Sequence, residues 1–504
     1  MEFECMTEKL PCERYGRLGE KQTQAEIHLD PEPGTSVERI LLAEVRPSVG
    51  RSECVRGEIR FFGRAECMAV YADAEGKIRR TTASAEFSDR LESDRANPAS
   101  EVGFECATVD LTCSQAGEGI RLSATFETAV FLREREELTS AVGCDSLIAR
   151  CEETELMRIT ACGTKTLIAE EEFEHKGQIT EICCSDFQAD LSGSVPAPDT
   201  LIAEGTGYLT LTYFDEETQS LEHLVRDFPI REEIEFPGCG SADLCALSVS
   251  AVRHSLALTP DEESKTTTVR LEAELCLRCK CFESASCRVC ADAFSPTHRL
   301  DCRYEEKEVT VYEGSVHTVE KVEGSSVLPE EMREIYRLIA VCASSAAVTG
   351  ARAEDGRLLA EGVIRADLLY DDDEGNKHGV AVEVPFALSA DSRMEADEIE
   401  ARAVVTEIYA RNRGREIDLF ATLSLRAEGY SQRRIRVLCG AEAGEELRPE
   451  FPMSVYFAAP GEPLFEACKA LGASEQTLRA QNGDLPERFE REERVVCYRG
   501  GETV

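Results

Sequence analysis

The stretch that decides the fold is EGVIRADLLYDDDEGNKHGVAVEVPF, residues 361–386. Apolar and polar side chains alternate on both sides of its acidic segment, which is the period of a β-strand with one face buried. An acidic run that ends in Gly375 is typical of the turn between two antiparallel strands. The stretch therefore predicts a β-hairpin whose first strand ends near Tyr370 and whose return strand carries Phe386.

The same pattern occurs twice more, around ECMAVYAD (residues 66–73) and YLTLTYFD (residues 208–215). Each time a glycine lies eight residues before a tyrosine, an aspartate lies two after it, and a phenylalanine follows the tyrosine after 15 or 16 residues. The recurring positions are Ile59, Gly63, Tyr71, Asp73 and Phe87, then Leu201, Gly205, Tyr213, Asp215 and Phe228, then Leu358, Gly362, Tyr370, Asp372 and Phe386. We expect the aspartate at the turn, the phenylalanine in the core and the glycine at a bulge or bend.

A second shared block follows each stretch, at residues 120–126, 269–275 and 417–423, again with strict alternation. Agreement at matching offsets indicates an internal triplication. The sequence thus predicts a mainly β chain of three tandem antiparallel repeats, each a sandwich or partial barrel. Within the repeats we expect one short helix, PEEMREIYRL at 329–338. The predicted limits are an N-terminal segment at 1–25 and repeats at 26–145, 160–292 and 310–436.

The last fifty residues differ, reading MSVYFAAPGEPLFEACKALGASEQTLRAQNGDLPERFEREERVVCY at 453–498. Pro460-Gly461 breaks a strand-like opening that contains Val455 and Phe457. Four apolar residues then follow at the spacing of an amphipathic helix: Leu464, Ala467, Cys468 and Leu471. Gly472 is suited to end that helix and Ser474 to cap a second one, and a closing strand follows. This order predicts a small α+β domain of βααβ type at 452–500.

The charge and the cysteines narrow the range of functions. A formal charge of -41 repels phosphate groups, which disfavours nucleic acids and anionic membrane surfaces as partners. The N-terminus has no basic region followed by an apolar core, and no run approaches 18 apolar residues, so we expect a cytoplasmic chain without a transmembrane segment. The 23 scattered cysteines are expected to be reduced and buried as small apolar side chains.

Motifs for catalysis are sparse. The seven histidines form no HxH or HExxH pair, and none recurs across the three stretches. The chain lacks a GxSxG elbow, a Walker loop and a GxGxxG fingerprint, so we expect neither enzymatic activity nor a cofactor. Two metal sites remain minor alternatives, a calcium site in the acidic run 371–376 and a zinc site at two CxxC pairs, Cys276, Cys279, Cys287 and Cys290. A solvated hairpin tip and buried thiols are the favoured interpretations.

The three stretches resemble the SPOCS domain of SipL-type sporulation proteins. The strongest likeness is 361–386, with its leading Glu-Gly, the alternating strand to tyrosine, the polar turn and the Val-Pro-Phe return. The second stretch keeps Glu204-Gly205, whereas the first has Phe62-Gly63. The last fifty residues resemble a LysM module, which such proteins carry after their SPOCS repeats. Here PGEPL at 460–464 stands where LysM modules show Pro-Gly-Asp-Thr-Leu.

This resemblance implies a structural role in the mother cell of endospore-forming clostridia. The LysM module of such proteins engages the coat morphogenetic ATPase at the forespore surface, which helps to tether the spore coat. It implies docking through the first loop and helix and through the second loop, at Pro460, Gly461, Glu462, Leu464, Phe465, Asn482 and Asp484. Core packing for Leu464 and Phe465, and a helix C-cap for Asn482, are the simpler readings of those residues.

The alternative function is binding of N-acetylglucosamine chains or peptidoglycan, because LysM modules that hold such chains use the same two loops. Glu462-Pro463 replaces the usual Asp-Thr of the first loop, and an acidic-basic run at 487–494 replaces a Pro-Gly turn. These departures favour a protein partner.

Overall fold

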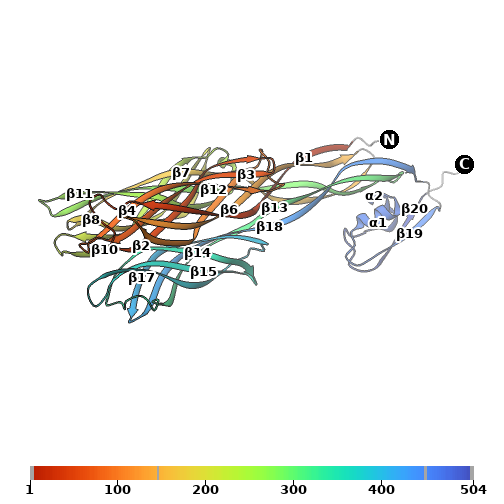
Figure 1. Ribbon diagram of the computed structural model, residues 1–504. Coiled ribbons are helices and arrows are strands. Elements are labelled where there is room, and N and C mark those ends of the chain that lie inside the picture. The colour runs from red at the N-terminus through yellow and green to blue at the C-terminus, as the bar shows by residue number, and fades with distance from the viewer. Residues whose placement is uncertain (1–4, 145–146, 448–450, 500–504) are drawn as a thin grey trace.

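The computed structural model describes residues 5–144, 147–447 and 451–499. It confirms that the chain is mainly β and that its sheets are antiparallel (Figure 1). Within the described residues, eighteen strands form six three-stranded sheets, and a two-stranded sheet with two helices follows at the C-terminal end. Neither helix has the length or the apolar composition needed to span a bilayer.

One order of strand pairing occurs three times along the chain. In each set of six strands, the first, sixth and fifth form one sheet, and the second, third and fourth form the other. The first set is β1 (Cys5–Leu29), β2 (Arg39–Val55), β3 (Glu58–Ala72), β4 (Ile78–Glu92), β5 (Glu101–Ala116) and β6 (Gly119–Cys144). The second is β7 (Ile148–Lys176), β8 (Ile179–Ala197), β9 (Thr200–Asp215), β10 (Ser220–Glu235), β11 (Leu244–Asp261) and β12 (Thr266–Phe294). The third is β13 (His298–Val327), β14 (Arg337–Glu354), β15 (Arg357–Asp371), β16 (Lys377–Asp391), β17 (Glu398–Arg413) and β18 (Glu416–Glu446).

The two sheets of a set share an apolar core. In the first set Ile27, Val45, Phe61, Phe87 and Phe126, which come from five different strands, belong to one buried cluster. The blocks at 120–126, 269–275 and 417–423 lie in β6, β12 and β18 and turn their apolar residues inward, as their alternation predicts. Each sandwich is therefore built on a central strand that has one fully buried face.

The recurring aspartate closes the hairpin turn, as expected. Asp73, Asp215 and Asp372 are at most 6% exposed. Each accepts two backbone N–H bonds from its own turn, for example from Glu374 at 3.0 Å and Asn376 at 2.8 Å in the case of Asp372. The acidic run at 371–376 is thus a hairpin tip whose buried carboxylate is occupied by its own backbone.

The recurring glycine lies opposite a β-bulge. Gly63, Gly205 and Gly362 face register shifts in β2, β8 and β14, respectively. A Cβ at Gly362 would overlap the carbonyl oxygen of Ala347 and lie 2.6 Å from the ring of Phe386. The phenylalanine is buried in all three sets, but Phe228 pairs with Gly207 instead of Gly205, because the β9–β10 register is offset from that of the other two hairpins.

The three longest strand pairs continue beyond the sandwiches as a stem (Figure 1). This stem consists of residues 5–17, 131–144, 148–160, 281–294, 298–313 and 430–446. Each pair has a register shift at the level where the stem begins, next to Gly19, Phe282 and Gly314. Such bulges bend strands, which lets the three pairs leave their sheets and converge.

Where the stem begins, one aromatic or aliphatic side chain from each of the six long strands joins a single cluster: Tyr15, Phe131, Ile159, Phe282, Tyr312 and Tyr430. Lys280 of β12 ends in this cluster, 2% exposed, with its Nζ 4.8 Å from the ring centres of Tyr15 and Tyr430. The ammonium pairs with Glu400 at 2.9 Å and Glu428 at 2.6 Å. Burial alone would lower the pKa of Lys280, but the two carboxylates outweigh burial and raise it above its usual value.

The predicted helix at 329–338 is wrong. The segment between β13 and β14 forms turns, and the guanidinium of Arg415 donates to the carbonyl oxygens of Leu328, Pro329 and Met332. Leu328 and Ile335 are buried against the third sandwich. The apolar spacing that suggested a helix therefore covers the end of a sheet, and an arginine satisfies carbonyl groups that a helix would have satisfied itself.

The strand limits differ from the domain limits expected from the sequence. Most of the segment 1–25 belongs to β1, which pairs with β6 along its whole length. Likewise β7 begins at Ile148 and β13 at His298, both before the expected starts at 160 and 310. The difference arises because the stem strands lack the recurring residues by which the limits were drawn.

Gly362→Ala tests the close approach at the bulge. We expect the substitution to lower the free energy of unfolding by about 2–3 kcal/mol, because backbone and ring must both move to admit the methyl group. Gly50→Ala is the matched control on an edge strand, since no atom lies within 4 Å of a Cβ there. Urea unfolding followed by circular dichroism measures both, and equal midpoints for the two variants would contradict the role given to Gly362.

Lys280→Ala tests the buried charge at the start of the stem. Its removal leaves the partly buried Glu428 without a cation and leaves Glu400 with Arg278 alone, at 2.7 Å, and we expect a loss of about 3 kcal/mol in the free energy of unfolding. Lys265→Ala removes an exposed lysine that pairs with Glu217 and should change stability by less than about 1 kcal/mol. Thermal unfolding of the two variants decides the point, and similar melting temperatures would show that Lys280 does not hold the stem strands together.

Candidate functional site

The C-terminal module, residues 453–498, consists of β19 (Met453–Ala458), α1 (Leu464–Leu471), α2 (Glu475–Asn482) and β20 (Glu493–Tyr498). The two strands pair antiparallel, and the buried sides of both helices and of the sheet form one core. Gly472 ends α1 in the left-handed conformation at φ 57°, and the Ser474 hydroxyl accepts the Thr477 N–H at the start of α2. Both helix ends thus use the residues that the sequence indicated.

The first loop of the module is tied to the loop that follows α2. Gly461, at φ 84°, donates its N–H to Phe489 O at 2.6 Å and accepts from the Arg488 guanidinium at 2.6 Å. Phe489 N–H donates to Glu462 O at 2.9 Å, and Leu464 N–H donates to Glu487 O at 2.8 Å. The acidic-basic run of the second loop therefore pairs with the backbone of the first loop.

The Glu462 carboxylate is also used inside the module. It accepts from the Tyr456 hydroxyl at 2.5 Å and from Ala459 N–H at 2.8 Å. The Tyr456 hydrogen bond holds the pKa of Glu462 below its usual value and raises the pKa of Tyr456 to about 12. Pro460, one residue before Gly461, is exposed in the turn after β19.

Leu464 and Phe465 have different surroundings. Leu464 is 3% exposed in the core of the module. The Phe465 ring faces outward from α1 and meets Phe294 of the stem edge-on, with ring centres 5.4 Å apart, while Arg150 lies over it at 5.4 Å. Phe465 therefore has a partner within the chain, at the junction between module and stem.

Two ion pairs complete this junction. Arg150 pairs with Glu466 at 3.0 Å and Asp292 pairs with Lys469 at 2.5 Å, each joining α1 to a stem strand. Burial opposes ionisation of Asp292, but Lys469 and neighbouring hydrogen bonds lower its pKa. The module is thus held at the end of the stem by one face of α1 (Figure 1).

Asn482 and Asp484 lie close in sequence and differ in role. The Asn482 amide donates to Val496 O at 2.7 Å and accepts from Val496 N–H at 2.8 Å, so it binds the outer edge of β20. It also donates to Leu478 O in its own helix. The Asp484 side chain is fully exposed, with Arg479 at 3.7 Å. Of the seven expected docking residues, Pro460 and Asp484 are thus the most open to a partner, and Asn482 has a clear structural role.

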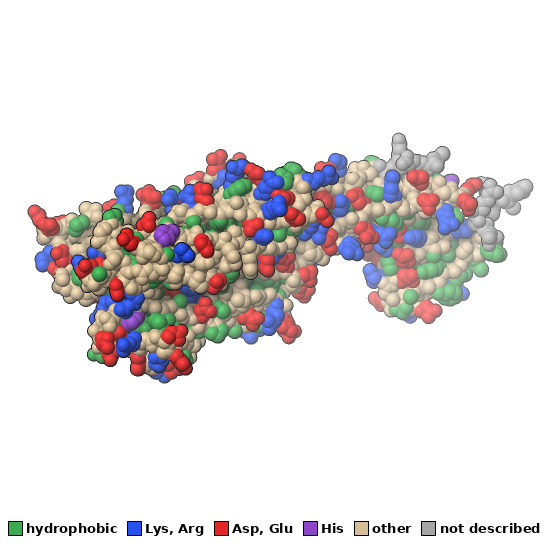
Figure 2. Space-filling model, viewed as in Figure 1, with side chains coloured by type: hydrophobic (Ala, Val, Ile, Leu, Met, Phe, Trp, Pro, Cys, Tyr) green, Lys and Arg blue, Asp and Glu red, His purple; other side chains and the backbone are tan. Residues whose placement is uncertain are grey.

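Sequence reasoning missed an exposed apolar surface of the module. Met453, Val455, Phe457 and Tyr498 are 41–62% exposed and point to the side of the sheet that faces away from the helices. Figure 2 shows apolar side chains gathered on this end of the molecule. The alternation of β19 predicted a strand. It did not reveal which side of the strand is exposed, because Met453, Val455 and Phe457 on one side and Ser454, Tyr456 and Ala458 on the other could each face the core.

The zinc alternative fails on strand geometry. All four cysteines lie in β12, where Cys276 and Cys279 point to opposite faces because they are three residues apart. Cys287 and Cys290 lie further along the strand, in two other clusters within the stem. Among the described residues, no group of three or more metal-ligating side chains is placed to hold an ion.

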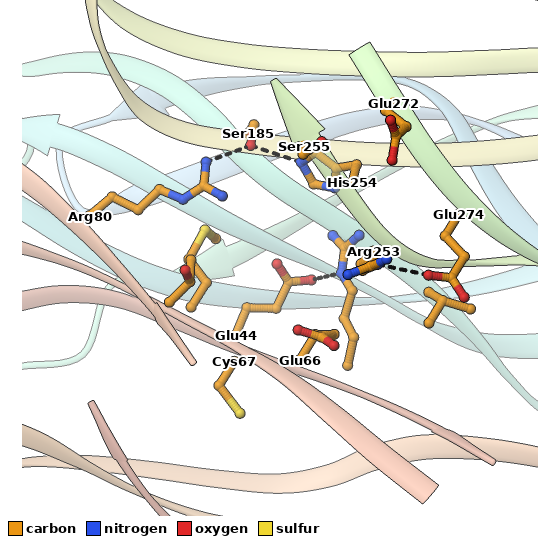
Figure 3. A pocket seen from close by; sticks show the side chains of 14 residues that line it. Glu44, Glu66, Cys67, Arg80, Ser185, Arg253, His254, Ser255, Glu272 and Glu274 are labelled. Carbon is orange, nitrogen blue, oxygen red and sulfur yellow. Dashed lines mark hydrogen bonds and ion pairs between the residues drawn. The ribbon is translucent and has the colours of Figure 1, made fainter. Parts of the chain in front are cut away.

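A cavity of about 250 Å³ lies between the first and second sandwiches (Figure 3). In it Ser185 of β8 hydrogen-bonds to Nε2 of His254 at 2.8 Å and accepts from Arg80 at 3.0 Å. Burial and the nearby guanidinium of Arg46 lower the pKa of His254 to about 3. Ser185 and His254 both belong to the second sandwich, and the bond from Arg80 joins them to the first. The Ser185 side chain is 1% exposed and occupied by these two partners.

His254 should make the chain sensitive to acid. Its folded-state pKa of about 3 lies below the ordinary value of 6.5, so its neutral form is favoured in the folded state. The contribution of neutral His254 to the free energy of unfolding is then fully present above pH 6.5 and decreases as the pH falls toward 3. At pH 5 the expected decrease is about 2 kcal/mol.

The measurement is urea unfolding at pH 7.5 and pH 5 for the native chain, His254→Gln and His28→Gln. In His254→Gln the free energy of unfolding should no longer fall by this amount between pH 7.5 and pH 5. In His28→Gln, at an exposed position of β1, the fall should remain. If all three lose the same stability between the two pH values, His254 is not the group responsible.

Comparison of the chain with family models, curated proteins and solved structures found no match. The likeness to SPOCS and LysM domains therefore rests on the residues quoted from the sequence. No family is assigned to the chain on these grounds.

Proposed function

We propose that this chain is a non-enzymatic assembly protein of the spore coat. Three SPOCS-like β repeats form an elongated body, and a LysM-like module at the end of that body docks on a coat morphogenetic ATPase at the forespore surface. The chain acts in the mother-cell cytoplasm. No cofactor takes part.

The recurring positions support the interpretation as three repeats. The same three residues, a glycine at a bulge, a buried tyrosine and an aspartate at a turn, occupy β2–β4, β8–β10 and β14–β16 in the same order. A shared sheet order alone could arise in unrelated sandwiches. Shared residues with one role at one place in each sheet favour copies of a single unit.

The observation that carries the docking role is the position of the module. It contacts the rest of the chain through α1, at Phe465, Glu466 and Lys469, and so lies at the far end of the stem. A module that served only to stabilise the body would bury its apolar surface there. Instead its sheet turns an apolar face to solvent, which is typical of an interaction surface.

The two loops of the module give a glycan little to bind. The N–H and C=O of Gly461, the C=O of Glu462 and the N–H of Leu464 are bonded to the second loop, and the Glu462 N–H donates to Ala459 O. A sugar chain between the loops would have to break these bonds or lie above them without partners. This pairing favours a protein partner.

Capture of the purified coat morphogenetic ATPase of the same organism tests the proposal. The full chain should retain the ATPase, and a chain that ends at Leu447 should lose it. Leu478→Asp provides a second test at full length, since Leu478 is 0% exposed in the module core and a carboxylate there should unfold the module alone.

Binding of the ATPase by the chain that ends at Leu447 would overturn the proposal and make the sandwiches the docking surface. Binding of an N-acetylglucosamine hexamer by the full chain, without binding of the ATPase, would establish the glycan function instead. Circular dichroism of each preparation controls for a general loss of fold.

A further inference from the structure

The sheet of the C-terminal module has two edges, which differ in whether their outward backbone groups have hydrogen-bond partners. In antiparallel pairs, hydrogen-bonded and non-hydrogen-bonded positions alternate along the strands. Arg499 N–H donates to Pro452 O at 2.9 Å, which marks these two residues as a hydrogen-bonded pair. The backbone groups of Met453, Val455 and Phe457 therefore point away from β20, as do those of their partners Arg494, Val496 and Tyr498.

The outer edge of β20 is closed by side chains of α2. The Asn482 amide bonds both the N–H and the C=O of Val496, at 2.8 and 2.7 Å. Gln481 does the same for Tyr498, at 2.7 and 2.8 Å. Two carboxamides thus replace the backbone of a third strand, and this edge can accept no partner.

The outer edge of β19 has no such cover. Within the described residues no strand pairs with it, and the sheet ends there. Its outward N–H and C=O groups belong to Met453, Val455 and Phe457, whose side chains are 49%, 41% and 62% exposed. An edge strand with free backbone groups and exposed apolar side chains is a template for pairing with another chain.

The sequence of β19 strengthens this reading. MSVYFA contains no charged residue, whereas each of the other nineteen strands in the described part of the chain carries at least one, and 30% of all residues are charged. Edge strands are normally protected by charges, prolines or short length. Of these three kinds of protection, β19 has only its short length. The uncovered edge therefore belongs to the one strand without a charged residue in the described part of the chain.

We propose that the open edge of β19 binds an extended segment of a partner protein, which adds to the sheet as a third strand and lays apolar side chains beside Met453, Val455 and Phe457. This inference rests on the proposed docking role of the module and specifies how the partner is held. Backbone bonds supply the attachment, and alternate side chains of the added strand supply the selectivity.

The charges indicate what the segment should carry. Arg494 lies opposite Phe457 on the same face, and that face has no acidic side chain among Met453, Val455, Phe457, Arg494, Val496 and Tyr498. Residues 451–499 hold eight acidic and six basic residues, against 89 and 50 in the rest of the chain. The nearly neutral module can therefore accept a segment of alternating apolar residues with an acidic residue near Arg494, which the body of the chain would repel.

Hydrogen exchange of the full chain, alone and with the purified coat morphogenetic ATPase, tests the inference at single-residue resolution. The amides of Met453, Val455 and Phe457 should become protected on binding. Those of Ser454, Tyr456 and Ala458 should be protected already, because they face β20. Retained binding without new protection on alternate residues of β19 would overturn the proposal.

Substitutions give an independent measure. Val455→Pro removes one outward N–H and no bond to β20, and should weaken binding at least tenfold. Phe457→Ser, which leaves the backbone intact, should weaken it several-fold. Tyr336→Ser is the matched control, since Tyr336 is an aromatic residue 76% exposed before β14, outside the module. Equal affinity for all three variants would refute the edge as the site.

The outcomes separate this inference from the proposed function. If the chain that ends at Leu447 also binds the ATPase, the docking role of the module fails. If the module is needed but the β19 variants bind as tightly as the native chain, only the edge fails. Protection of β19 in the chain alone, together with a dimer in sedimentation velocity, would identify a second copy as the occupant and overturn the choice of partner.

Discussion

The structure depends on one buried ammonium group. Lys280 reaches from the second sandwich into a cluster to which every long strand contributes a side chain, and its two carboxylate partners both come from the third. An unpaired charge at that place would cost several kcal/mol, so the three strand pairs must arrive together and in register. Buried ion pairs generally add little net stability over well-packed apolar groups, so we infer that the role of this contact is to specify how the second and third sandwiches meet.

A second junction joins the sandwiches away from the stem. Arg46 of the first pairs with Asp186 of the second, and Asp186 accepts from Ser344 N–H of the third. Around it an apolar cluster draws on all three sandwiches, including Cys183, Cys184 and Cys342. The junction at Lys280 and the junction at Asp186 lie at different positions along the molecule, and together they fix the three sandwiches relative to one another. A single junction would leave them free to rotate about it. The end of the stem, and the module on it, are therefore held at a set distance from the sandwiches.

The sequence predicted what depends on neighbours along the chain and missed what depends on distant ones. Strand alternation, the turn aspartates, the bulge glycines and the helix caps at Gly472 and Ser474 are local, and the structure has them. The stem could not be predicted, because its strands are stabilised by residues more than a hundred positions away, as Tyr15 by Thr310 and Gln432. The segment 329–338 failed for the same reason, since Arg415 decides its conformation. At the candidate site the sequence predicted the two strands and two helices of the module. It did not predict the hydrogen bonds between the two loops, because most of these join backbone groups and so do not depend on side-chain types.

The contrast between the two edges of the C-terminal sheet supports our proposal that the edge of β19 is a binding site. An edge of this sheet can be closed by only two side chains, because those of Gln481 and Asn482 bond the outward backbone groups of β20. A charge in β19 would protect the other edge at no cost to the core, since Met453, Val455 and Phe457 point to solvent. An uncharged, apolar edge is a liability for aggregation that proteins normally remove. The presence of such an edge in a chain of charge -41, on a module at the end of the stem, therefore supports the proposed binding of a partner segment there.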